Sequence, residues 1–136
     1  YTPRTLFPYT TLFRSGTFLS TIPFARKYGV LQSPLELWIE NSTICSVASD
    51  IPGLADDFNK YLNANPSNRR VEELGIGTNE GVKDLYARNA GFEERHCGLH
   101  LGLGGGQKGS HHLDLIFASG VLALDDKPVF DGTFAF

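Results

Sequence analysis

The sequence predicts an α+β domain, with a mixed or antiparallel β-rich core and about two short helices. Short runs that alternate apolar and polar residues recur along the chain between turn residues, which is typical of β-strands. Only two stretches carry apolar residues at helical spacing. The 136 residues suffice for one domain, and 41% of them are hydrophobic, as in ordinary globular proteins.

The expected strands and helices are spread over the whole chain. Asn41-Ser42 is a turn signal between two alternating runs, which indicates a hairpin. Leu54, Phe58 and Leu62 recur at the spacing of one helix face. We expect strands at 17–22, 35–40, 43–47, 71–76, 99–103, 113–117, 121–124 and near 129–130, and helices at 52–63 and 79–89.

The first fifteen residues differ in kind from the rest. Residues 5–15 read TLFPYTTLFRS, which is identical to one reading frame of a widely used short-read sequencing adapter. Segments of this origin are excluded from fold reasoning. We therefore expect 1–15 to be adapter-derived, 16–136 to form a partial domain, and the upstream gene to be missing. The alternative is a genuine β-rich segment, since Thr, Phe, Leu and Tyr favour strands.

Composition excludes some classes of partner. The formal net charge is −3 and the chain has no basic run, Arg69-Arg70 being no more than a pair, so we expect no nucleic acid. No apolar run approaches the ~20 residues that cross a bilayer, and no signal peptide pattern is present. Cys45 and Cys97 share no motif spacing, which favours free thiols in a reducing compartment. We expect a cytoplasmic protein with no membrane partner.

The histidines are the most informative residues, since all four lie between positions 96 and 112. His112 and Asp114 are two apart, so on a strand their side chains share one face. The glycine-rich segment 104–109 could return the chain and bring the strand of His100 alongside them. Imidazole and carboxylate on one face suit Zn, Mn, Co or Fe(II). The alternative is that these histidines are surface residues or hydrogen-bonded core residues.

Three glutamates are weaker candidates. Glu73 lies in an apolar run, where a charge costs several kcal/mol unless it is paired or bound to a metal. The alternative for Glu73 is a solvent-facing position on the polar side of its strand. Glu93 and Glu94 form an acidic pair, which in isolation indicates a solvated loop. No nucleophile stands out, because Ser110 beside His111 says nothing about a triad and Cys97 fits a core position.

Three segments together resemble the M29 (aminopeptidase T) metallopeptidase family. They are residues 70–79 (RVEELGIGTN), 93–104 (EERHCGLHLGLG) and 110–115 (SHHLDL), and the resemblance extends over 16–136 as a C-terminal part of that family. It implies an exopeptidase that releases N-terminal residues with divalent Zn, Co or Mn. Matched by position, the implied metal ligands are Glu73, Glu93, His100, His112 and Asp114, with Glu73 also as the catalytic carboxylate.

The chain departs from that family's pattern at several positions. Leu113 stands where the family has Trp, Glu94 where it has Lys, and the segment between His100 and His112 is shorter. The chain also resembles Fe(II)-dependent ring-cleaving dioxygenases of the 2,5-dihydroxypyridine type, which need only two His and one Asp. A third alternative is a metal-free binding or scaffold relative, such as those attached to peptide natural-product pathways. The expected partner is a peptide or small-molecule substrate, and a homodimer is left open.

Overall fold

The structure, a computed structural model, describes residues 11–15, 18–19, 24–117, 121–124 and 127–131. Its strands are β1 (Thr11–Ser15), β2 (Phe18–Leu19), β3 (Leu35–Glu40), β4 (Thr43–Ser49), β5 (Val71–Gly77), β6 (Gly98–Leu103), β7 (Leu113–Phe117), β8 (Val121–Leu124) and β9 (Lys127–Asp131). Its helices are α1 (Phe24–Tyr28), α2 (Leu54–Ala64), the 3₁₀ helix η1 (Pro66–Arg69) and α3 (Ala90–Glu93).

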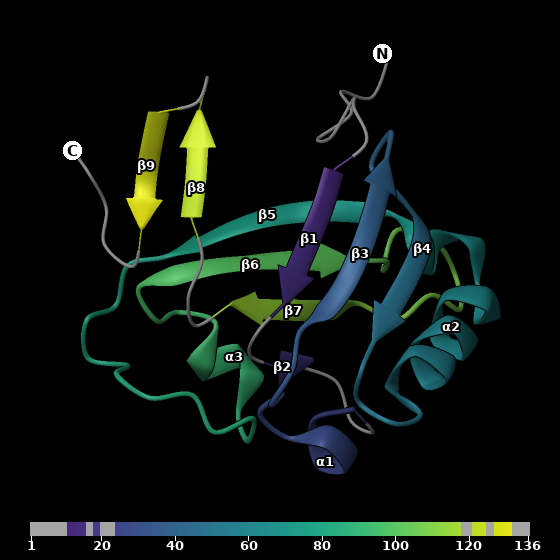
Figure 1. The fold of residues 1–136 in the computed structure, drawn as a ribbon, viewed down its shortest axis with the longest axis horizontal. Coiled ribbons are helices and arrows are strands. Elements are labelled where there is room, and N and C mark those ends of the chain that lie inside the picture. Colours follow the sequence, from purple (N-terminus) through teal and green to yellow (C-terminus); the bar gives the residue numbers. More distant parts are fainter. Residues whose placement is uncertain (1–10, 16–17, 20–23, 118–120, 125–126, 132–136) are drawn as a thin grey trace.

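The described strands form antiparallel sheets, which confirms the predicted α+β class. One sheet has the order β1-β3-β4, a second has the order β2-β7-β6-β5, and β8 pairs with β9. In Figure 1, β1, β3 and β4 cross steeply over the strands β5, β6 and β7, and α2 lies beside β4. The two larger sheets and α2 therefore share one interior.

The core lies between these two sheets. Strand β3 turns Leu35, Leu37 and Ile39 inward at alternate positions, as the sequence pattern predicted. The second sheet contributes Leu101, Leu103, Leu113 and Leu115, and α2 adds Leu54, Phe58 and Leu62; all of these are buried in one cluster. Each such side chain stabilises the fold by roughly 1.5–3 kcal/mol through burial.

The alternation that buries the leucines also creates a polar face. In β6 and β7 the register pairs Leu101 with Leu115 and Gly102 with Asp114. Successive side chains of a strand point to opposite faces of the sheet. With Leu101 and Leu115 in the core, His100 and Asp114 lie on the face of this sheet that points away from β3.

Helix α2 fixes the start of β7. The Tyr61 hydroxyl donates a hydrogen bond of 2.8 Å to the backbone carbonyl of His111. Asn68, which follows α2, accepts bonds from the Ser110 hydroxyl at 2.8 Å and from the His111 backbone N–H at 3.3 Å. These contacts join segments more than 40 residues apart in the chain. They hold the chain that leads into His112.

Most of the predicted elements are confirmed, but the helix expected at 79–89 is wrong. The described part of that segment is irregular, and the only helical turn nearby is α3. Asn79 accepts a hydrogen bond from the Gly81 backbone N–H through its side chain, and Ala87 has a positive φ of 58°. A local side-chain bond of this kind competes with helix formation. Of the strand expected at 17–22, only Phe18 and Leu19 lie within the described residues and both are in β2.

The segment 1–15, which we expect to be adapter-derived, is partly outside the described residues. Residues 1–10 are not described, while Thr11–Ser15 form β1 and pair with β3. The boundary expected between residues 15 and 16 stays a prediction. In the ranges that the structure covers, no helix combines the length and the apolar character needed to cross a membrane.

Candidate metal centre

Three neighbouring strands bring the predicted ligands to one place. Glu73 of β5 and Asp114 of β7 are both register partners of Gly102, which lies between them on β6. The His100 Nε2 atom lies 3.1 Å from Glu73 Oε1. The His112 Nε2 atom lies 2.8 Å from Asp114 Oδ1 and 3.8 Å from Glu73 Oε2. The predicted convergence of His100 with His112 and Asp114 is therefore confirmed.

The cluster contains two groups of ligand atoms that share one carboxylate. Atoms of Glu73, His112 and Asp114 lie within 4.8 Å of one another, and so do atoms of Glu94, His100 and Asp114. Ligands that sit 2.0–2.6 Å from an ion are at most about 4–5 Å apart. Each group has the size and the donor chemistry of a divalent cation site.

The His100 ring has a buried nitrogen without a hydrogen-bond partner among the described residues. The residue is only 9% exposed, and the nitrogen is Nδ1. Because Glu73 is an acceptor, a neutral His100 ring carries its proton on Nε2 and leaves a lone pair on Nδ1. A buried nitrogen without a partner costs about 1–3 kcal/mol. A cation would satisfy this lone pair, as metal-binding histidines with a carboxylate on the other nitrogen do.

Glycines on the neighbouring strands make room for the imidazoles. A Cβ atom on Gly75 would lie 1.9 Å from His100 Nε2, and one on Gly102 would lie 2.6 Å from His112 Cε1. Both distances are impossible for a real side chain, so each ring lies against bare backbone. The sequence signal for this role was a glycine placed across from a histidine in the strand register.

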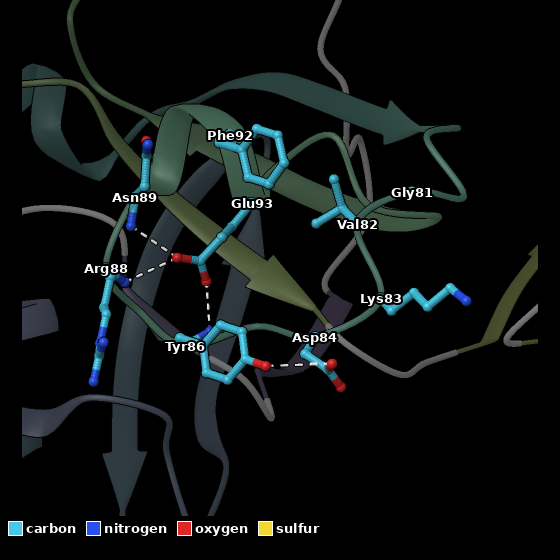
Figure 2. A pocket seen from close by; sticks show the side chains of 9 residues that line it. All are labelled: Gly81, Val82, Lys83, Asp84, Tyr86, Arg88, Asn89, Phe92 and Glu93. Carbon is cyan, nitrogen blue, oxygen red and sulfur yellow. Dashed lines mark hydrogen bonds between the residues drawn. The ribbon is translucent and has the colours of Figure 1, made fainter.

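Glu93 does not join the cluster, because its carboxylate is used elsewhere. Its Oε2 accepts the backbone N–H groups of Tyr86 and Ala87 at 2.6 and 2.9 Å, and its Oε1 accepts those of Arg88 and Asn89 at 2.9 and 2.7 Å. Figure 2 shows the carboxylate turned toward this loop. Burial alone would raise the pKa of Glu93, but the four N–H groups together hold it below its ordinary value.

The neighbouring residue, Glu94, takes the place that Glu93 was expected to have. Its carboxylate is in the group with His100 and Asp114. The assignment by resemblance was thus displaced by one residue. No pattern in the sequence separated the two glutamates, since Glu93 ends the short helix α3 and Glu94 follows it directly. Glu73, His100, His112 and Asp114 do come together, and their role as metal ligands stays a prediction.

The other two histidines have structural positions. His96 is buried, and its ring nitrogens contact the backbone carbonyls of Glu93 and Phe117 at 2.9 Å each. His111 is exposed and contributes backbone contacts to α2 and Asn68. The run of four histidines therefore divides into two cluster residues and two residues that fit the alternative of core or surface positions.

One family model matches most of the chain. The family model described as "Crocagin biosynthetic protein CgnE/B" matches residues 26–124, which is more than half of the chain. The chain belongs to the CgnE/B family. The matched region includes β3 to β8, and so the whole His–carboxylate cluster. Neither the curated proteins nor the solved structures contain a match to the chain.

Membership of the CgnE/B family corrects the resemblance drawn from short motifs. Assignment to the M29 metallopeptidases is wrong, and so is the function inferred from it, an aminopeptidase, hydrolase or protease. The dioxygenase alternative is unsupported by the match as well. The physical reason is that the three motifs are strands in which leucines must alternate with glycine and polar residues. The same packing requirement can impose similar short strings on unrelated families.

Proposed function

We propose that the chain acts in the biosynthesis of crocagin or a related compound, and that it binds a divalent cation at the His–carboxylate cluster. Family membership supports the biosynthetic part. The observation that carries the cation site is the buried His100 ring. Its Nδ1 has no partner among the described residues, while oxygens of Glu73, Glu94 and Asp114 lie within 4.8 Å of a ring nitrogen. Three carboxylates around two imidazoles would otherwise repel one another.

The donor set and its exposure define what such a site could do. Imidazole nitrogen with carboxylate oxygen suits Zn, Mn, Co or Fe(II). Glu73 and His112 are exposed, while His100 and the Asp114 side chain are largely buried. A cation held here would have protein ligands on its inner side and an open position on its outer side. That open position would take a carbonyl or carboxylate oxygen of a pathway substrate.

The test is equilibrium dialysis of purified protein against Zn, Mn and Co, followed by elemental analysis. The wild type should retain metal, and His112→Ala should lower the affinity by at least the roughly 10–100-fold typical of losing even an outer partner of a ligand. His111→Ala is the matched control, since its ring lies outside both ligand groups. Cys97→Ala is a second control for adventitious thiol binding. Equal metal content in all four proteins would reject the site.

A second candidate function, binding of a peptide partner, is favoured by the outer edge of β5. Within the described chain β5 pairs with β6 on one side, while its other edge is contacted only at its start, where the Val71 N–H donates to the Ser42 carbonyl at 2.8 Å. Leu74 and Ile76 are 39% and 51% exposed. An unpaired edge flanked by apolar side chains is suited to the addition of an extended peptide as a further strand.

Amide hydrogen exchange tests whether a peptide binds at the β5 edge. Addition of the pathway substrate should slow exchange of the β5 amides, and Ile76→Lys should abolish that protection, while Val30→Lys, at another exposed apolar position, should not. Protection that grows with protein concentration and without substrate would instead show pairing of two copies. Unchanged exchange under both conditions would reject the edge as a binding site.

We further propose that the protein works in the cytoplasm. Cys45 is exposed and neither it nor Cys97 forms a disulfide. Free thiols of this kind persist in reducing compartments. Thiol titration of protein isolated under non-reducing conditions should recover two reactive groups after denaturation, whereas their loss to a disulfide would contradict the proposed location.

A further inference from the structure

A second concave site lies away from the His–carboxylate cluster. It is a hollow of about 470 Å³, and its lining residues all come from the single segment 81–93: Gly81, Val82, Lys83, Asp84, Tyr86, Arg88, Asn89, Phe92 and Glu93. Figure 2 shows Phe92 and Val82 on one side of the hollow and Tyr86 on the other, with Glu93 between them. A volume of this size fits small-molecule sites in proteins.

The segment is irregular but anchored. The Glu93 carboxylate ties the backbone of residues 86–89 to α3 through four hydrogen bonds of 2.6–2.9 Å. Val82 is buried beneath the segment, and its N–H donates to the Asn79 carbonyl at 3.2 Å. The hollow is thus formed before any ligand arrives, which lowers the entropic cost of binding.

Two exposed aromatic rings border the hollow. Tyr86 is 63% exposed and Phe92 is 49% exposed, and they account for two of the five large hydrophobic residues found exposed in the described part of the chain. Grouped exposed apolar surface marks interaction sites. Rings on two sides of a hollow favour a flat guest, because stacked or edge-to-face aromatic contacts add to simple burial.

Two cations and two carboxylates line the hollow, and both carboxylates are already hydrogen-bonded. Glu93 accepts four backbone N–H groups, and Asp84 accepts the Tyr86 hydroxyl at 3.3 Å. Lys83 and Arg88 are exposed at opposite ends of the lining, and neither forms an ion pair within the described residues. Their long side chains can reach a carboxylate on a guest that occupies the hollow.

We propose that this hollow binds an aromatic ring that carries a nearby carboxylate, such as an aromatic acid or the C-terminal aromatic residue of a peptide. The ring lies between Tyr86 and Phe92 over Val82, and the carboxylate pairs with Arg88 or Lys83. This inference does not rest on the cation site, because none of the lining residues belongs to either ligand group.

The test uses N-acetylphenylalanine and its uncharged amide as probes, with binding followed by two-dimensional NMR of labelled full-length protein. The acid should bind saturably and shift amide signals of residues 81–93, and the amide should bind more weakly. Phe92→Ala should weaken binding of both probes by roughly 2- to 10-fold. Arg88→Gln and Lys83→Gln together should remove the preference for the acid.

Arg26→Gln is the matched control, because Arg26 is exposed and lies outside the hollow. It should leave both affinities unchanged. Phe92 is half exposed, so its loss should leave the spectrum of the unbound protein dispersed and confirm folding. The proposal is overturned if neither probe shifts residues 81–93, if acid and amide bind equally, or if Arg26→Gln weakens binding as much as the double variant.

Discussion

The His100 imidazole lies directly over the backbone of Gly75, so closely that a Cβ atom there would be 1.9 Å from Nε2. The contact couples a residue without a side chain on β5 to a buried ring on β6. Because this space is empty, the ring can hold its Nε2 atom beside Glu73. Its Nδ1 atom is then buried without a partner among the described residues. The geometry of the candidate cation site therefore depends on a glycine that binds nothing.

Gly75→Ala should displace His100 and lower the affinity for a divalent cation by more than about 10-fold, as expected when the support of a ligand is lost. Competition with a chromophoric chelator measures the affinity. Gly91→Ala is the control, because a Cβ atom there would meet no other atom within 4 Å. If both alanine variants keep the wild-type affinity, His100 is not a ligand.

Asp114→Asn should reduce cation binding more than His112→Ala does. Asp114 contributes to both ligand groups, whereas His112 contributes to one. Titration calorimetry of the two variants gives the comparison, with His111→Ala as the reference. An Asp114→Asn variant that binds as well as His111→Ala would show that the two groups do not form the site.

Glu93→Gln should destabilise the protein by about 1–3 kcal/mol, because an amide nitrogen then faces backbone N–H groups that need an acceptor. Urea unfolding at pH 7 measures the change. A loss confined to well below this range would indicate that solvent already satisfies the loop at residues 86–89.

The stability that Glu93 contributes should depend on pH. The pKa of Glu93 in the folded state lies below its ordinary value of 4.5, so its contribution is complete above about 4.5 and is lost as the pH falls through the folded-state pKa. The stability difference between the wild type and Glu93→Gln should therefore be constant from pH 7 to 5 and shrink below pH 4.5. A difference that grows on acidification would contradict the assigned hydrogen bonds.

Tyr61→Phe should cost about 1 kcal/mol, the usual value of one hydrogen bond, because its hydroxyl donates to the His111 carbonyl at the start of β7. Burial, and then the charge of Asp114, raise the pKa of Tyr61, so this bond persists to alkaline pH. Thermal unfolding should show the full difference between Tyr61→Phe and the wild type at pH 8, and a smaller difference above pH 10, where Tyr61 ionises in the unfolded chain before it does in the fold. A difference that is the same at pH 8 and pH 11 would contradict the raised pKa of Tyr61.

Regular alternation made much of the fold predictable. The pattern of residues 35–40 gave β3 with its buried face correct, because a strand with one face in the core leaves a period of two in the sequence. The helical spacing of Leu54, Phe58 and Leu62 gave α2. The pairing of the His100 strand with the His112 strand followed from a glycine-rich turn between two apolar runs.

Tertiary competition explains what failed. Residues 79–89 have a composition compatible with a helix, but the N–H groups of residues 86–89 are claimed by a buried carboxylate that follows them in the chain. Because the Glu93 carboxylate binds these N–H groups, Glu93 does not join the cluster, whereas Glu94 does. The three short motifs did not identify the family correctly, because sheet packing can impose similar short sequences on unrelated proteins. The match over residues 26–124 covers far more of the chain.

The most direct test of the cation site is X-ray absorption of the zinc-loaded protein. We predict only nitrogen and oxygen ligands at about 2.0–2.1 Å, with imidazole scattering that weakens in His100→Ala. A shell at about 2.3 Å would place the metal on sulfur, and so on Cys45 or Cys97. That result, or a spectrum unaltered by His100→Ala, would contradict the account.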